Sequence, residues 1–186
     1  MKLFLTGATG FIGGAIARAA ILAGHQVTAL VRSKASGPAV SLSKIGVALH
    51  VGDLRDPHTF SAAAGTANAV IYTASTNDAS AGAVDEAAAL AILAAQPAGA
   101  AFIYTSGAWV YGDTGGTSAT EASGLNPPLL VAWRPAVERK VLALATSGRR
   151  SRATAGHGSR RWRRGLRHVG RDGARERRRA DRWHRP

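Results

Sequence analysis

The sequence contains no cysteine, which excludes disulfide bridges, thiolate nucleophiles and cysteine-bound metal sites. It also lacks any uninterrupted run of about 20 apolar residues, so no membrane span is expected, and its opening apolar run is too short for a signal peptide. The six histidines are scattered without the spacing of metal ligands. These absences favour a cytoplasmic protein without a metal, and 186 residues suffice for one domain with a substantial core.

Acidic residues are scarce at the C-terminal end, where the composition changes abruptly. Residues 149–186 hold fifteen of the 24 Lys+Arg residues, all arginine, but only three of the eleven acids. This segment therefore carries +12 of the net charge of +13, and residues 1–148 are almost neutral. After Ser151 its only aliphatic side chains larger than alanine are Leu166 and Val169, so we expect a disordered basic tail.

Two interpretations of the Arg-rich tail are open. Its arginines and interleaved tryptophans would suit an arm that contacts nucleic acid or other polyanions without specificity. The alternative, which the change of composition at one point favours, is a stretch read out of frame or a truncated C-terminus.

Residues 1–148 alternate between short β-rich runs and helical patterns. The expected strands are residues 2–6, 26–31, 46–51, 68–73 and 101–105, and the expected helices are residues 11–23, 57–64, 84–95 and 133–146. In the first helix, Ile12, Ile16, Ala19 and Ala23 share one face, which we expect to be apolar packing surface. This alternation predicts an α/β fold with a Rossmann-type, doubly wound parallel sheet.

A glycine-rich turn joins the first strand to the first helix. Gly7, Gly10 and Gly13 follow the spacing G-x-x-G-x-x-G, with an apolar strand before them and a helical pattern after them. Glycines in this context let backbone N–H groups approach a pyrophosphate at the N-terminus of the helix. The turn therefore predicts nucleotide binding.

The chain resembles the extended short-chain dehydrogenases/reductases, also called the NAD-dependent epimerase/dehydratase family. The resemblance covers about residues 1–147 and rests on four ordered motifs: GATGFIG at residues 7–13, GDLRD at 52–56, AVIYTA at 69–74 and YTSGAWVYG at 104–112. It implies that residues 1–148 form an NAD(P)-binding domain. It further implies cofactor contacts from Gly7, Thr9, Gly10, Phe11, Ile12, Gly13, Asp53, Leu54, Thr73 and Ala74.

The end of the second strand bears on the choice of cofactor. Arg32 stands there with Ser33 and Lys34, where an acidic residue would bind the ribose 2′-hydroxyl of NAD. A guanidinium pairs with a 2′-phosphate, so we expect NADP to be preferred, with NAD as the alternative.

The catalytic centre that the resemblance implies is incomplete. The family places a serine at Ser106 and a Tyr-x-x-x-Lys pair on a later helix, but no tyrosine follows Tyr111 and none has lysine four residues on. Tyr111, which follows Ser106 closely, is a candidate substitute acid. Arg134 and Glu138, spaced as neighbours on a helix, are expected to form a solvated pair.

The sequence is compatible with three functions. The resemblance implies an oxidoreductase, epimerase or dehydratase acting on a carbonyl compound or nucleotide sugar, with weak or no catalysis by the chain as written. A non-catalytic dinucleotide sensor and a polyanion-binding protein are the alternatives. Oligomeric state cannot be inferred from the sequence.

Overall fold

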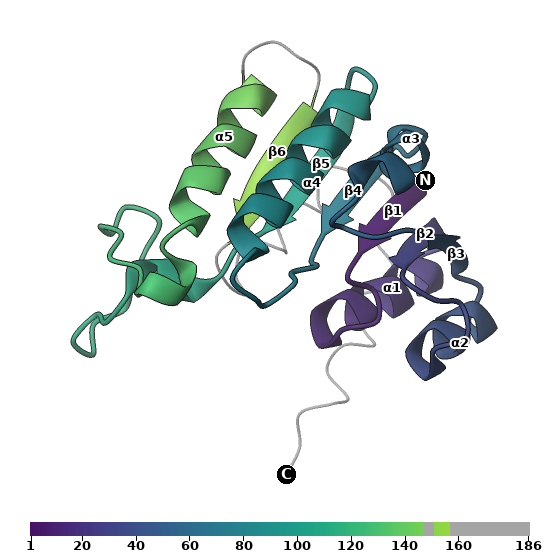
Figure 1. The fold of residues 1–186 in the computed structure, drawn as a ribbon, viewed down its shortest axis with the longest axis horizontal. Coiled ribbons are helices and arrows are strands. Elements are labelled where there is room, and N and C mark those ends of the chain that lie inside the picture. Colours follow the sequence, from purple (N-terminus) through teal and green to yellow (C-terminus); the bar gives the residue numbers. More distant parts are fainter. Residues whose placement is uncertain (147–150, 157–186) are drawn as a thin grey trace, which may run out of the picture.

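The computed structural model describes residues 1–146 and 151–156 (Figure 1). Six strands form one sheet in which every neighbouring pair is parallel, in the order β3-β2-β1-β4-β5-β6. They are β1 (Lys2–Thr6), β2 (Gln26–Val31), β3 (Ala48–Val51), β4 (Ala69–Tyr72), β5 (Ala100–Thr105) and β6 (Ser151–Gly156). The strand order reverses between β1 and β4, which confirms the predicted Rossmann-type, doubly wound sheet.

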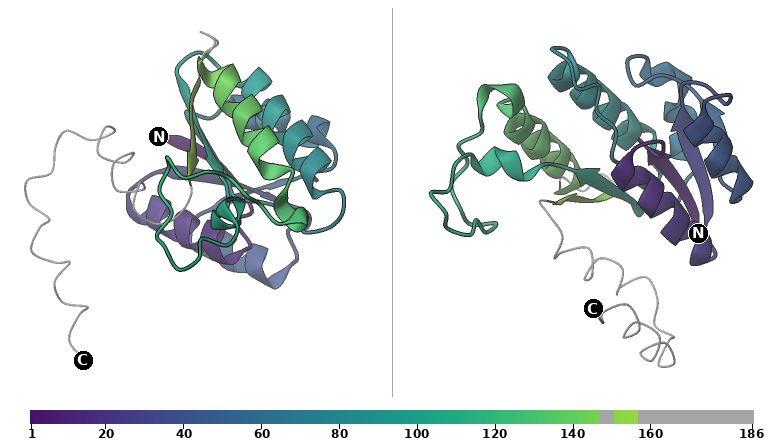
Figure 2. Two further views of the ribbon diagram at one scale, coloured as in Figure 1. Left: turned by 90° about the vertical axis from the view of Figure 1, so that its left-hand side faces the viewer. Right: turned by 90° about the horizontal axis from the view of Figure 1, so that it is seen from below.

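Helices cover both faces of the sheet (Figures 1 and 2). One face carries α1 (Phe11–Leu22) and α2 (Gly37–Lys44), and the other carries α3 (Ser61–Gly65), α4 (Ala81–Ala95) and α5 (Arg134–Thr146). Successive side chains of β1 point to opposite faces of the sheet, so β1 contributes to both cores. Leu3 and Leu5 pack under α1 and α2, whereas Phe4 packs under α3 to α5. Three short 3₁₀ turns complete the fold: η1 (Pro57–Thr59), η2 (Ala108–Tyr111) and η3 (Leu129–Val131).

Of the four residues on the predicted face of helix α1, only Ile16 packs against the core. The buried residues of this helix are Gly13, Gly14, Ala17 and Ala20, whereas Ile12 is 52% exposed and Ala19 and Ala23 are also exposed. The reason is close approach. Small side chains let the helix lie directly against the sheet, while Ile16 and Ile21 are partly buried against the same core and Phe11, Ile12 and Leu22 are exposed.

Two elements were not predicted. Helix α2 is only eight residues long and begins with Gly37 and Pro38, a composition typical of a turn, although proline is tolerated in a first helical turn. A sixth strand was not among those expected, because residues 151–156 have no aliphatic side chain larger than alanine. Strand β6 nevertheless pairs with β5 along all six of its residues, since strand pairing is made by the backbone.

No helix in the described part of the chain has the length and apolar character needed to cross a membrane. Most of the Arg-rich tail, residues 157–186, lies outside the described residues.

Candidate functional site

The glycine turn after β1 is shaped by contacts that exclude side chains. Gly7 has φ +73°, a left-handed conformation, and a Cβ there would lie 2.7 Å from Thr73 Oγ1 and 2.8 Å from the Ala74 nitrogen. A Cβ at Gly13 would lie 2.2 Å from the Gly7 carbonyl oxygen. These two glycines are therefore required by the packing of α1 against the ends of β1 and β4.

Gly10 has a different surrounding. A Cβ there would meet only the Gly7 carbonyl oxygen, at 3.3 Å, so packing within the protein does not by itself demand glycine. Gly10 is the N-cap of α1, no side chain caps the helix, and the residue lines a pocket. An uncapped helix N-terminus facing a pocket, with no side chain in the way, suits a phosphate group.

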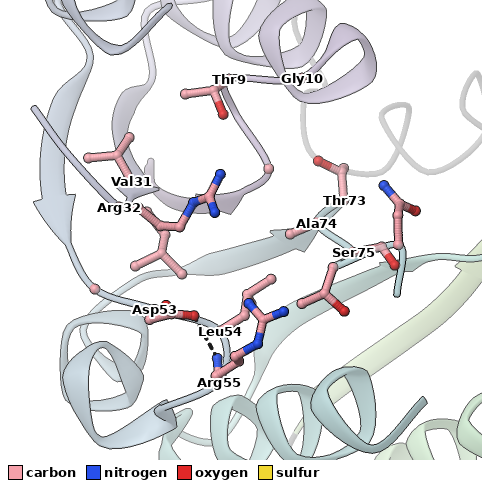
Figure 3. A pocket seen from close by; sticks show the side chains of 15 residues that line it. Thr9, Gly10, Val31, Arg32, Asp53, Leu54, Arg55, Thr73, Ala74 and Ser75 are labelled. Atoms are coloured by element: carbon pink, nitrogen blue, oxygen red, sulfur yellow. Dashed lines mark hydrogen bonds between the residues drawn. The ribbon is translucent and has the colours of Figure 1, made fainter. Parts of the chain in front are cut away.

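The pocket lies at the carboxyl ends of the central strands and encloses about 350 Å³ (Figure 3). That volume is within the usual range of small-molecule sites, about 300–1,000 Å³. Open parallel sheets bind ligands where the strand order reverses, which here is between β1 and β4. Its lining includes eight of the residues expected to contact cofactor: Gly7, Thr9, Gly10, Arg32, Asp53, Leu54, Thr73 and Ala74.

Three other residues of the turn lie outside that lining. Phe11 is 94% exposed and Ile12 is 52% exposed, while Gly13 is buried on the face of α1 that packs against the turn at Gly7. In the first turn of a helix the backbone N–H group, not the side chain, is what an anion contacts.

Thr6, which is not among the predicted site residues, links the two central strands beneath the pocket. Its buried hydroxyl accepts hydrogen bonds from the N–H groups of Thr73 (3.2 Å) and Ala74 (3.3 Å), and Thr73 Oγ1 donates to the Thr6 carbonyl oxygen at 2.7 Å. The sequence feature that could have indicated this role is a threonine that ends an apolar strand directly before the glycine turn.

The loop after β3 forms another side of the pocket. The Asp53 N–H donates to Thr59 Oγ1 at 3.1 Å, and the Asp53 carboxylate accepts from the Arg55 N–H at 2.9 Å (Figure 3). The Arg55 guanidinium pairs with Asp78 at 2.5 Å, which links this loop to the segment after β4. Both loops are thus held in place around the pocket.

Arg32 and Arg55 direct their guanidinium groups into the pocket from different loops (Figure 3). Arg55 has Asp78 as its partner, but Arg32 has neither a hydrogen bond nor an ion pair with any residue that the structure describes. A guanidinium in this position is available for an anionic ligand.

Ser106 and Tyr111 lie beyond β5, outside the lining of this pocket. Ser106 Oγ donates a hydrogen bond to Glu138, which is only 6% exposed. Burial, together with Glu121 and Glu138, raises the pKa of Tyr111, which makes its phenol a weaker proton donor. The role of Tyr111 as a substitute acid stays a prediction, and its surroundings do not favour it.

The expectation of a solvated Arg134–Glu138 pair is wrong, because both side chains are largely buried. Arg134 lies 3.9 Å from Asp85, with a side chain 16% exposed, and its guanidinium stacks on the Trp133 ring at 4.5 Å. Helix α5 packs its first two turns onto the sheet and α4, which helical spacing alone cannot indicate.

A buried carboxylate organises this second region. Asp85 is fully buried on α4 and accepts hydrogen bonds from Tyr72 Oη (3.1 Å) and Tyr104 Oη (3.0 Å). Burial raises the pKa of Asp85, while the two tyrosines and Arg134 act in the opposite direction. Burial beside this carboxylate also raises the pKa of Tyr72 and Tyr104 far above the usual value, so both phenols stay protonated as donors.

Solved structures of known proteins share this fold. A UDP-glucose 4-epimerase of Stenotrophomonas maltophila, solved with bound NAD, superposes with a TM-score of 0.71 at 18% identity, over 83% of this chain and 52% of that one. A short-chain dehydrogenase/reductase superfamily protein of Agrobacterium tumefaciens, also with bound NAD, gives 0.69 at 21% identity, over 83% and 48%. These similarities show the fold.

Sequence relatives match part of the chain. An uncharacterized protein of Schizosaccharomyces pombe is 40% identical over 78 residues, which are 42% of this chain and 26% of that protein. The chain thus spans about half the length of the solved structures and about a quarter of this curated relative. The sequence pattern of the NAD(P)H-binding family matches residues 7–141, so the chain belongs to that family and carries its nicotinamide-dinucleotide-binding domain.

Proposed function

We propose that this domain binds NADP(H) in preference to NAD(H) and serves a protein that transfers hydride to or from a carbonyl compound or nucleotide sugar. The observation that carries the cofactor preference is Arg32, a guanidinium in the pocket without a partner among the described residues. Arg32 is exposed at the pocket, and a guanidinium forms its strongest hydrogen bonds with a charged acceptor such as the NADP 2′-phosphate.

The residues that line the pocket support this proposal. The N–H groups at the start of α1, with Gly7 and Gly10, would hold the diphosphate. Asp53 and Leu54 would face the adenine, and Thr73 and Ala74 would lie along the dinucleotide where β4 ends. The bound dinucleotide would supply hydride chemistry, and the protein's part is to bind and orient it.

Calorimetric titration of the full chain with NADPH and with NADH tests this proposal. We expect NADPH to bind at least tenfold more tightly. Arg32→Ala should weaken NADPH binding by about 10- to 100-fold, the value of a charge-assisted hydrogen bond, and leave NADH within about twofold. The matched control is Arg139→Ala, which removes an exposed arginine of α5 away from the pocket.

The proposal fails in a recognisable way. Equal affinity for the two dinucleotides, unchanged by Arg32→Ala, would refute the NADP preference but keep the dinucleotide site. Absence of binding by either dinucleotide to folded protein would refute the site itself.

A non-catalytic dinucleotide sensor is the second candidate, and helix α5 favours it. In the segment where the family carries its tyrosine and lysine, Val137 is buried in the core and Trp133 packs against Gly82 of α4. Neither side chain can transfer a proton. Saturable NADPH binding with no oxidation by any carbonyl compound would support the sensor.

The other expectations from the sequence stay predictions. They are a cytoplasmic location and non-specific contact of the Arg-rich tail with polyanions. Deletion of residues 157–186 tests the second, since it should abolish salt-sensitive binding to heparin.

A further inference from the structure

A carboxyl group reaches the end of β5 from a helix far along the chain. Glu138 lies in the second turn of α5, and its side chain accepts a hydrogen bond from Ser106 Oγ. The two residues are 32 positions apart, and Glu138 is 6% exposed. A charged group is rarely buried to this extent unless a partner or a function compensates for the lost hydration.

The hydrogen-bonded hydroxyl lies next to the cofactor pocket. Strands β4 and β5 are paired up to Tyr72 and Tyr104, so Ser106 follows β5 where Thr73 and Ala74 follow β4. Thr73 and Ala74 line the pocket. Ser106 is half-buried, which leaves part of its surface for a ligand, whereas Glu138 behind it is almost enclosed. A substrate at this edge would contact Ser106 and not Glu138.

The core beneath the pair holds it in one arrangement. Val137, next to Glu138, is 2% exposed, and Val141, one turn further on, is fully buried against the same cluster. One turn earlier, Arg134 lies beside the buried Asp85. The face of α5 that carries Glu138 is therefore packed on both sides, which fixes the direction of the carboxyl group.

We propose that Ser106 and Glu138 form a proton relay that replaces the missing tyrosine and lysine, with Ser106 as the catalytic residue and Glu138 as the positioning residue behind it. This inference rests on the proposed hydride-transfer function. In the oxidation of an alcohol, the substrate O–H proton passes to Ser106 Oγ while the Ser106 proton passes to the Glu138 carboxylate. The C–H bond breaks with its electron pair moving to the oxidised dinucleotide, and the C=O bond forms. Reduction runs the same transfers backwards.

The kinetic test uses the full chain with NADPH and three carbonyl probes: propanal, benzaldehyde and cyclohexanone. We expect oxidation of NADPH with at least one probe, and a fall in kcat of about 100-fold or more in both Ser106→Ala and Glu138→Gln. KM and the affinity for NADPH should change by less than about threefold. Glu138→Asp should recover part of kcat, and the double variant should be no slower than either single variant, because the two residues act in one path.

A control separates the relay from a general effect of removing an acid. Glu86→Gln removes a carboxylate on α4 that pairs with Lys140 at the surface, and its kcat should equal that of the unaltered chain. If Glu138→Gln leaves kcat unchanged while Ser106→Ala abolishes it, the relay is overturned. If NADPH binds but no probe is turned over by the unaltered chain, the relay is also overturned, whereas the cofactor site stands.

A second readout does not depend on turnover. In protein labelled with ¹³C-glutamate, the infrared difference between the unaltered chain and Glu138→Gln isolates the Glu138 carboxyl stretch. We expect Ser106→Ala to shift that band, because its hydrogen-bond donor is lost, and Glu86→Gln to leave it in place. A band whose position is unchanged in Ser106→Ala would contradict the contact on which the relay depends.

Discussion

The edge of the sheet at which the strands end has two halves, one at β1 to β3 and one beyond β5, and they are formed by different kinds of contact. At the ends of β1, β2 and β3 the site is formed mainly by backbone, because glycines bring a helix N-terminus and a turn together around the pocket. Beyond β5 the site is formed by side chains, with Asp85, Arg134 and Glu138 brought to Tyr104 and Ser106 from two helices. Backbone constraints leave short motifs in a sequence, and side-chain clusters assembled from distant segments do not.

Gly13→Ala should have the largest effect on stability, since it adds an atom at the tightest contact of the half formed by backbone. The added Cβ would lie 2.2 Å from a carbonyl oxygen, and backbone cannot move aside as a side chain can. We expect a loss of about 3 kcal/mol in the free energy of unfolding, measured by urea denaturation. Gly37→Ala is the control, because its Cβ meets nothing within 4 Å and alanine favours a helix. A small cost for Gly13→Ala would mean that α1 does not pack as closely as described.

Gly10→Ala should separate ligand binding from stability in the same turn. The nearest protein atom to its Cβ would be 3.3 Å away, but the Cβ would enter the pocket at the N-terminus of α1. We expect an affinity for NADPH lower by about tenfold or more, with a free energy of unfolding within about 1 kcal/mol of the unaltered chain. Calorimetry and urea denaturation on the same preparation measure both. Unchanged affinity would show that the diphosphate does not lie against Gly10.

The difference between the halves also explains what the sequence could predict. The strands β1 and β2 were predicted residue for residue, and eight of the expected cofactor contacts line the pocket. Three of the four residues on the predicted face of α1 are exposed, because its packing depends on how closely glycine and alanine let the helix approach the sheet. Glu138 was interpreted as a surface group because the sequence says nothing about which segment lies opposite it.

Two aspartates should show opposite responses to pH, one for each kind of environment. Burial raises the pKa of Asp85 above the ordinary aspartate value of 3.8. The contribution of Asp85 to stability is therefore fully present below pH 3.8 and is lost as the pH rises through the pKa of the folded state. Hydrogen bonds from Ser80 lower the pKa of Asp78, so its contribution is present above 3.8 and is lost as the pH falls through the folded pKa.

Urea denaturation from pH 3 to 7 measures both contributions. We expect Asp85→Asn to flatten the decline in the free energy of unfolding above pH 3.8, and Asp78→Asn to flatten the decline below it. A decline on the same side of 3.8 for both residues would contradict the difference in their surroundings.

The smallest effect should come from charge at the surface of the side-chain-built half. Lys140 pairs with Glu86 across α5 and α4, but their side chains are 54% and 33% exposed. Solvent screens such a pair, so Lys140→Gln should cost about 0.5 kcal/mol more than the matched Arg139→Gln, and the difference should shrink in 1 M NaCl. A cost comparable to that of Gly13→Ala would mean that α4 and α5 are joined by surface charge. The fully buried Asp85 beside Arg134 and the core around Val137 and Val141 indicate instead that the interior joins them, because water does not compete with the contacts made there.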